Sequence, residues 1–138
     1  MISKKLKLLF LLSIPLFITH GLEEYFTGFF NIDPIFKFVF QYFENMTVFQ
    51  ATFLLFQIML WLFLITFFFL ILGGKWPLRL MVILGVVLIF ELHHIIRAIV
   101  EWGYYPGVLT ALLFPILAFF FWKELINNFK ELETQKLE

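Results

Sequence analysis

The sequence contains no cysteine and only two serines. The absence of cysteine excludes disulfides, thiolate metal ligands and a cysteine nucleophile. Ser3 lies in a basic N-terminal segment and Ser13 lies inside an apolar run, so a Ser-His-Asp apparatus has no suitable nucleophile. Charge is scarce as well, because ten basic residues balance ten acidic ones. This balance gives no indication of nucleic acid as a partner.

Apolar residues, in contrast, are abundant. Hydrophobic residues make up 62% of the 138 residues and aromatic residues 22%. Average usage is roughly 45–50% apolar, so a soluble domain of this length could not hide so much apolar surface. We therefore expect a single integral membrane domain over residues 1–138, with the lipid bilayer as the solvent of most of the chain.

Four apolar stretches are long enough to cross a bilayer as helices. The sequence thus predicts an all-α fold, a four-helix transmembrane bundle with spans at about 7–30, 47–72, 78–100 and 107–123. A charged cytoplasmic tail is expected over residues 124–138. Between the first two spans, Lys37, Gln41 and Glu44 recur at helical spacing, which predicts a short amphipathic helix in the membrane interface at about 34–46.

Lysine and arginine are distributed unevenly around these spans. One side of the membrane receives Lys4, Lys5, Lys7, Lys75, Arg79, Lys123, Lys130 and Lys136. The opposite loops receive Lys37. The positive-inside rule therefore predicts that both termini are cytoplasmic, and we expect the cytoplasmic membrane of a bacterium as the location.

Ionisable residues recur at one depth of the expected bundle. The first span carries the sequence His20-Gly21-Leu22-Glu23-Glu24, and the third carries Glu91, His93, His94 and Arg97. At about 1.5 Å per residue, His20 lies roughly 20 Å beyond Lys7 and Glu91 roughly 18 Å beyond Arg79. Both groups thus fall in the outer half of the membrane. Such residues in apolar helices are costly, usually face the bundle interior and mark a functional site.

The spacing of these residues is typical of metal ligands. His20 with Glu23, and Glu91 with His94, each place an imidazole and a carboxylate one helical turn apart. Glu-x-x-His pairs from two helices help to build metal sites inside four-helix bundles. We expect these four residues to bind one divalent ion, with Glu24 as a further carboxylate. Zinc, iron and manganese all accept such ligands.

The third span leaves two assignments open. His93 and His94 are adjacent, and the sequence does not decide which of them faces the site. Arg97 lies one turn beyond them and is expected to pair with Glu23 or Glu24, or to hold an anionic head group. A network of buried salt bridges among the same residues, which fixes helix register and binds nothing, is the structural alternative.

Two segments carry a family resemblance. The sequence His20-Gly21-Leu22-Glu23-Glu24 resembles the signature of the HXXEE-motif family of small membrane proteins, a family of unknown function. The sequence Tyr105-Pro106-Gly107-Val108-Leu109-Thr110 is similar to a later Pro-Gly-containing stretch of that family. The resemblance extends from the first span to the fourth. It implies that His20, Glu23 and Glu24 form the characteristic site, and it implies no established activity.

Three classes of function fit this cluster. A membrane enzyme would use Glu23, Glu24 and Arg97 as catalytic residues on a lipid or isoprenoid-like substrate, as a metal-dependent hydrolase or an acid/base isomerase. A non-catalytic scaffold would use the cluster as a polar clasp. A carrier subunit would bind a transported proton or ion there, but the inner halves of the spans offer little beyond Ser13 and Thr66. The sequence favours these classes in that order and leaves the oligomeric state open.

Overall fold

The computed structural model describes residues 2–134, and these residues are helical throughout, apart from short turns. Four helical stretches are long and apolar enough to cross a membrane: Lys4–Thr27, Val48–Leu72, Trp76–Val100 and Val108–Thr134. Helices α1 (Lys4–Thr27) and α4 (Val48–Leu72) are continuous. The third stretch divides into α5 (Trp76–Phe90) and α6 (Leu92–Val100), and the fourth into α7 (Val108–Ala111) and α8 (Phe114–Thr134). The predicted all-α fold class is confirmed.

Helix α1 begins and ends at recognisable caps. The Ser3 side chain accepts a hydrogen bond from the Leu6 backbone N–H, and Pro15 lies inside the helix without ending it. Gly28 adopts a left-handed conformation with φ +72° and closes the helix. The expected first span, 7–30, therefore ends at Thr27, and the short helix α2 (Phe29–Ile32) follows.

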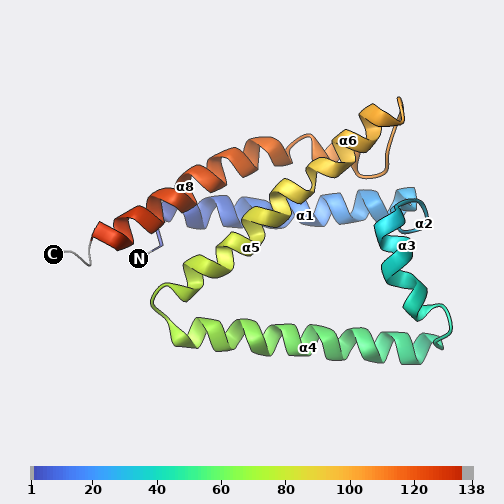
Figure 1. Ribbon diagram of the computed structural model, residues 1–138, viewed down its shortest axis with the longest axis horizontal. Helices are drawn as coiled ribbons and strands as arrows, with labels where there is room; N and C mark the ends of the chain where they lie inside the picture. Colours follow the sequence, from blue (N-terminus) through green and yellow to red (C-terminus); the bar gives the residue numbers. More distant parts are fainter. Residues whose placement is uncertain (1, 135–138) are drawn as a thin grey trace.

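The segment between α1 and α4 contains two short elements instead of one helix over 34–46. Helix α3 (Pro34–Phe40) is followed by the 3₁₀ turn η1 (Gln41–Phe43). Asp33 caps α3, because its carboxylate accepts hydrogen bonds from the Ile35 and Phe36 backbone N–H groups. Figure 1 shows α3 running crosswise between α1 and α4, the orientation expected of an interfacial segment.

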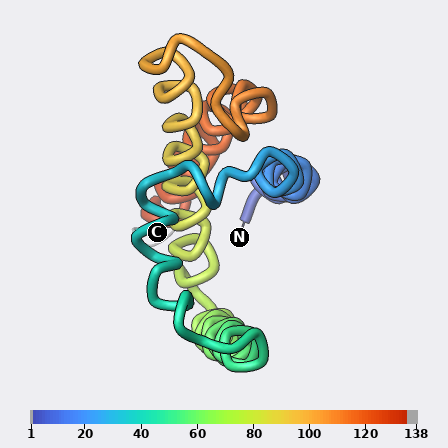
Figure 2. The backbone as a smooth tube through the Cα atoms, turned by 90° about the vertical axis from the view of Figure 1, so that its right-hand side faces the viewer, coloured from blue at the N-terminus to red at the C-terminus, as the bar shows by residue number. Residues whose placement is uncertain are grey.

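The core is formed by α1, α5 and α8. It consists of Leu6, Leu78, Leu88, Ala111, Phe114, Ala118, Phe121 and Leu125. Helix α4 is peripheral, and none of its most apolar stretch is buried. Figures 1 and 2 show α4 set apart from α1, with α3 and α5 leading to its two ends.

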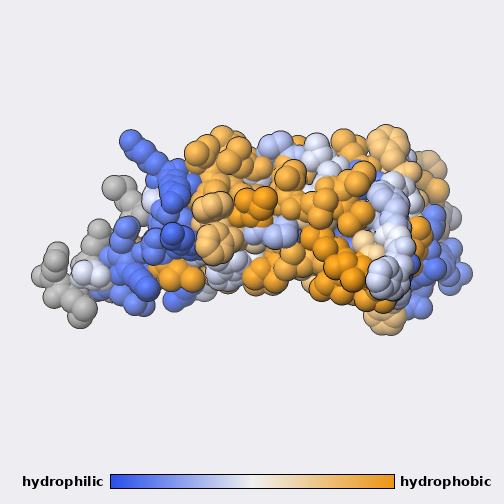
Figure 3. Space-filling view, turned by 90° about the horizontal axis from the view of Figure 1, so that it is seen from above, coloured by the Kyte–Doolittle hydropathy of each residue, from blue (hydrophilic) through white to orange (hydrophobic). Residues whose placement is uncertain are grey.

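The surface is divided along the long axis of the molecule into an apolar middle and polar ends (Figure 3). Figure 3 shows hydrophobic side chains over the middle of the molecule and hydrophilic ones at both ends. The start of α1 and the end of α8 lie at the same end (Figure 1). The four long apolar helices and this distribution fit a membrane protein, whereas the cytoplasmic position of the termini remains a prediction.

Helix α8 extends well beyond the expected fourth span, 107–123. Leu125 and Asn128 are buried, so the first part of the expected tail over 124–138 packs on the core. The Asn128 side-chain oxygen accepts a hydrogen bond from the Ser3 backbone N–H at 2.7 Å, which joins the end of α8 to the start of α1. Residues 135–138, including Lys136, lie outside the described residues.

Helices α5 and α8 approach each other most closely at Gly85. The Trp122 indole Nε1 donates a hydrogen bond to the Gly85 carbonyl oxygen at 2.9 Å. A Cβ atom on Gly85 would lie 2.8 Å from Trp122 Cε2, closer than van der Waals contact allows. The indole therefore requires a glycine at this position.

We predict that Gly85→Ala destabilises the protein, because the added methyl group displaces the Trp122 ring. Overpacking of this kind costs about 1–3 kcal/mol. Unfolding in mixed detergent, followed by circular dichroism, measures the change. Gly21→Ala is the matched control, since a Cβ on Gly21 of α1 would meet no atom within 4 Å. Equal stability of the two variants would contradict the packing argument.

Candidate metal centre

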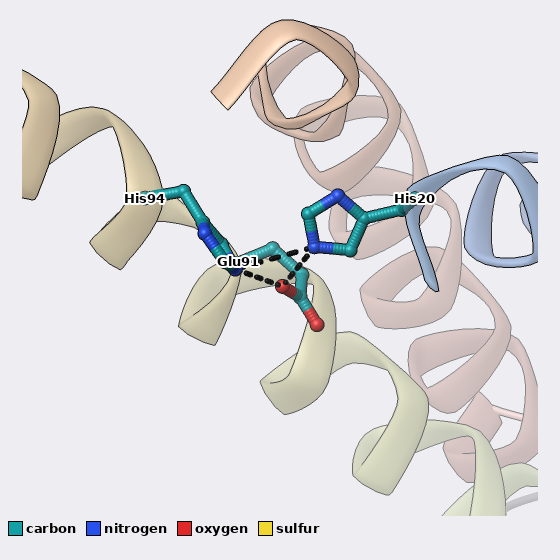
Figure 4. A group of neighbouring side chains, drawn as sticks. All are labelled: His20, Glu91 and His94. Atoms are coloured by element: carbon teal, nitrogen blue, oxygen red, sulfur yellow. Dashed lines mark hydrogen bonds and ion pairs between the residues drawn. The ribbon is translucent and has the colours of Figure 1, made fainter. Parts of the chain in front are cut away.

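Three elements that are distant in the sequence meet near one end of the core. His20 projects from α1, Glu91 stands at the junction between α5 and α6, and His94 lies one turn into α6. His94 is completely buried and His20 is 2% exposed. Figure 4 shows the two imidazole rings converging with the Glu91 carboxylate. The sequence-based expectation that His20, Glu91 and His94 share one layer matches this arrangement.

The spacing of the three side chains suits the ligands of a single metal ion. The His20 Nε2 atom lies 3.0 Å from Glu91 Oε2 and 3.3 Å from His94 Nε2. The third side of the triangle, from His94 Nε2 to Glu91 Oε2, is 3.5 Å. Two ligand atoms bound at about 2.0–2.1 Å in a tetrahedral site are about 3.3–3.4 Å apart. The three atoms can therefore contact one ion.

Glu24 supplies a fourth electron-rich atom. Its Oε1 atom lies 3.2 Å from His94 Nε2 and 3.6 Å from His20 Nε2. The Glu24 side chain is 23% exposed, which makes it the most accessible member of the group. It adds a second carboxylate beside the two imidazoles, as the sequence predicts.

Hydrogen bonds on the far side of each ring determine which nitrogen faces the centre. The His94 Nδ1 atom lies 2.6 Å from the Pro106 carbonyl oxygen. A carbonyl oxygen only accepts hydrogen bonds, so this nitrogen carries the proton. When the ring is neutral, the His94 Nε2 atom therefore presents a lone pair to the centre.

The same argument applies to His20. Its Nδ1 atom lies 2.7 Å from the Thr110 hydroxyl oxygen. That hydroxyl donates its hydrogen to the Glu23 carboxylate, with 2.6 Å between the oxygen atoms, so it accepts the hydrogen bond from His20. The Nε2 atom of a neutral His20 ring is then also a bare lone pair.

These assignments leave two lone pairs and two carboxylates facing one another inside an apolar bundle. Four electron-rich atoms at these distances repel one another unless a positive charge lies among them. The charge is either a proton on the imidazoles or a metal ion. His20, Glu91 and His94 could therefore hold a metal ion at this centre.

Gly107 makes room for both rings. Its φ of +86° is left-handed, and a Cβ atom there would lie 2.7 Å from His94 Nδ1 and 2.9 Å from His20 Cε1. Only glycine accommodates that conformation and that approach without strain. The Pro106-Gly107 pair thus has two functions, since Pro106 fixes the His94 tautomer and Gly107 admits the imidazoles.

Comparison with models of known protein families gives one match for this chain. A family model described as a protein of unknown function with HXXEE motif matches residues 11–121, which include the whole centre. The chain belongs to the HXXEE family. Searches of curated proteins and of solved structures found no match. The histidine and the two glutamates of the motif name correspond here to His20, Glu23 and Glu24.

The two glutamates of the HXXEE motif point in different directions. Glu24 reaches the imidazoles, whereas Glu23 accepts hydrogen bonds from the Leu109 and Thr110 backbone N–H groups at 3.1 and 2.9 Å. These groups begin the short helix α7, whose N-cap, Gly107, has no side chain to bind them. Tyr104 also donates to Glu23, at 3.0 Å. Glu23, expected to be a metal ligand or catalytic residue, instead caps α7 and orients His20 through Thr110.

Two further expectations for the third span are resolved by the structure. His94 belongs to the centre, whereas His93 lies beside its ring, with its Nδ1 atom 3.0 Å from the Phe90 carbonyl oxygen and its Nε2 atom 3.9 Å from Asp33 Oδ2. Arg97 lies 3.9 Å from Glu101, and both side chains are exposed. The expected pairing of Arg97 with Glu23 or Glu24 is therefore absent from the described residues, where the ion-pair partner of Arg97 is Glu101.

The sequence did not predict a buried hydrogen-bonded pair, Tyr105 and Asp33, beside the centre. The Tyr105 hydroxyl donates to the Asp33 carboxylate at 2.9 Å, between residues 72 positions apart. Burial would raise the pKa of Asp33, but the hydrogen bonds from Tyr105, Phe36 and Ile35 lower it. Burial and the bond to Asp33 raise the pKa of Tyr105 to about 12. The pair joins the start of α3 to the loop before α7. In the sequence, only the position of Asp33 directly before Pro34 indicates a structural role for this carboxylate.

We predict that Gly107→Ala disrupts the HXXEE centre. The added methyl group strains the backbone and displaces the two imidazole rings, with an expected loss of stability of about 1–3 kcal/mol. Nitrogen-15 NMR of labelled histidines reports the change directly, because His20 and His94 lose their shared Nδ1-protonated pattern. Gly103→Ala in the same loop is the control, since its nearest contact would be an ordinary 3.7 Å. Unchanged histidine signals in Gly107→Ala would refute this role.

Proposed function

We propose that this HXXEE protein is a membrane enzyme that binds one divalent ion, zinc, iron or manganese, and hydrolyses a lipid-like substrate. His20, Glu91 and His94 are the proposed metal ligands. The observation that carries the proposal is the triangle of two Nε2 lone pairs and a carboxylate oxygen, with sides of 3.0–3.5 Å. We place the enzyme in a bacterial cytoplasmic membrane with both termini cytoplasmic, as the distribution of lysine and arginine indicates.

The ligand set supports catalysis more than a purely structural metal. Structural zinc sites use four protein ligands, most of them cysteines, whereas catalytic sites use three and leave a position for water or substrate. Two histidines and one carboxylate also suit iron and manganese. When bound in such a site, a divalent ion lowers the pKa of a coordinated water to about 7 and so supplies a nucleophile at neutral pH.

Glu24 is the proposed general base. Its carboxylate lies beside both imidazoles and also lines a cavity of about 180 Å³ together with Tyr25, Phe29 and Phe36. A water molecule in this cavity can give a proton to the Glu24 carboxylate. The oxygen of that water then bonds to the acyl carbon of an ester. The acyl–oxygen bond then breaks, and the departing alcohol takes the proton from Glu24.

The alternative is a polar clasp in which protonated histidines pair with Glu24 and Glu91. Distances of 3.0–3.6 Å between imidazole nitrogens and carboxylate oxygens are compatible with such ion pairs. The clasp and the enzyme differ in the cation at the centre, a proton in one and a metal ion in the other. Metal content therefore separates them.

We predict near-stoichiometric zinc, iron or manganese in protein purified without chelator, and its loss in His20→Ala and His94→Ala. Elemental mass spectrometry measures the metal, and circular dichroism verifies folding. His93→Ala is the matched control, because His93 is adjacent to His94 on α6 but supplies no atom to the triangle. Folded wild-type protein without metal would contradict the metal enzyme, as would a metal content that is equal in all four proteins.

A further inference from the structure

A large apolar cavity lies between α1, α4 and α5. It has a volume of about 620 Å³, within the range of about 300–1,000 Å³ that is usual for small-molecule pockets. Its lining is apolar over almost its whole surface, including Phe10 and Phe17 of α1, Thr66 of α4 and Val87 of α5. Because α4 is the peripheral helix, this cavity lies at the side of the molecule that faces lipid.

One stripe of α1 connects this cavity to the centre. Phe10, Phe17, Gly21 and Glu24 are separated by seven, four and three positions, so they lie on one face of the helix. Phe10 and Phe17 line the large cavity, whereas Gly21 and Glu24 line the smaller one. A Cβ on Gly21 would meet no atom within 4 Å, and Gly21 is exposed, so the surface of α1 is open between the residues that line the two cavities. We call this stripe with its two cavities the α1 groove.

The position of the α1 groove relative to the metal ligands is defined by helical turns. Phe17 precedes His20 by one turn of α1, and Val87 precedes Glu91 by about one turn at the end of α5. The large cavity therefore ends about one helical turn before His20 on α1 and before Glu91 on α5. Its other end is lined by Ile2 and Pro77, near the charged end of the molecule. The ten residue steps from Pro77 to Val87 correspond to about 15 Å of helix.

We propose that the α1 groove binds a single acyl or prenyl chain of a lipid, whose head-group oxygen reaches the metal centre past Gly21. This inference rests on the proposed function and specifies its substrate class. A chain that is apolar along its length and carries a carboxylate or ester oxygen at one end matches a groove that is apolar along its length and ends at Glu24. The head-group oxygen takes the position that the three protein ligands leave open.

Helix α3 covers the head-group end of the groove. Phe36 and Phe40 of α3 line the smaller cavity opposite Gly21 and Glu24. The hydrogen bond between Tyr105 and Asp33 fixes the start of α3 to the loop that carries Gly107. The same segment that orients His94 thus also positions the cover of the groove, which excludes bulk lipid from the centre.

A photoreactive fatty acid tests this inference. The probe is palmitic acid with a diazirine in mid-chain, added with zinc to protein in phosphatidylcholine nanodiscs and irradiated, and the labelled peptides are mapped by mass spectrometry. We expect labelling of the cavity-facing residues of α5 and α4, including Met81 and Thr66, and competition by unlabelled palmitate. Gly21→Phe fills the open space and reduces this labelling at least tenfold, whereas Gly21→Ala retains it.

Metal content measured on the same samples separates the two proposals. If the Gly21→Phe protein retains its metal but is no longer labelled in the groove, the result supports the lipid site. Labelling that spreads evenly over exposed faces of α4 and α8, or that Gly21→Phe leaves unchanged, would overturn the lipid site alone. Cross-links between two copies through the groove would also overturn it, in favour of a helix of a second copy. The wild-type protein could also contain no metal and still show groove labelling that Gly21→Phe reduces. That result would refute the metal enzyme and still support the lipid site.

Discussion

The repulsion among the electron-rich atoms of His20, His94, Glu24 and Glu91 is the constraint on which the rest of this structure depends. In water these groups would be solvated separately, but within apolar helices a shared proton or a metal ion is needed to offset their repulsion. Most of the unusual features nearby serve to maintain that arrangement. The Pro106 carbonyl and the Thr110 hydroxyl hold the ring tautomers, and Gly107 leaves space for the rings.

The loop between α6 and α7 therefore functions as part of the centre, although it carries no ligand. Glu23 closes the first turn of α7 and fixes the hydroxyl that supports His20. Tyr105 fixes Asp33, which in turn begins α3. Three segments that are distant in the sequence are thus joined by hydrogen bonds to buried or partly buried carboxylates. This coupling explains why the family motif in α1 and the Pro-Gly segment before α7 occur in the same chain.

Much of this could be predicted from the sequence because it depends on composition and helical spacing alone. The four apolar stretches, the shared depth of His20 and Glu91, and the one-turn spacing of Glu91 and His94 are properties of single helices. The different contacts of Glu23 and Glu24 do not follow from a single helix. Adjacent positions differ by about 100° around a helix, and packing determines which of the two side chains faces the imidazoles. The partner of Arg97, the peripheral position of α4 and the bond from Tyr105 to Asp33 depend on tertiary contacts as well. A sequence pattern contains no direct signal for them.

The central claim is that two imidazole nitrogens and a carboxylate oxygen bind one metal ion. X-ray absorption spectroscopy at the edge of the bound metal tests it most directly, because imidazole rings add a characteristic outer-shell signal. Our account predicts two histidine nitrogens and at least one carboxylate oxygen at about 2.0–2.1 Å for zinc. A first shell made only of oxygen atoms, with no imidazole signal, would contradict it.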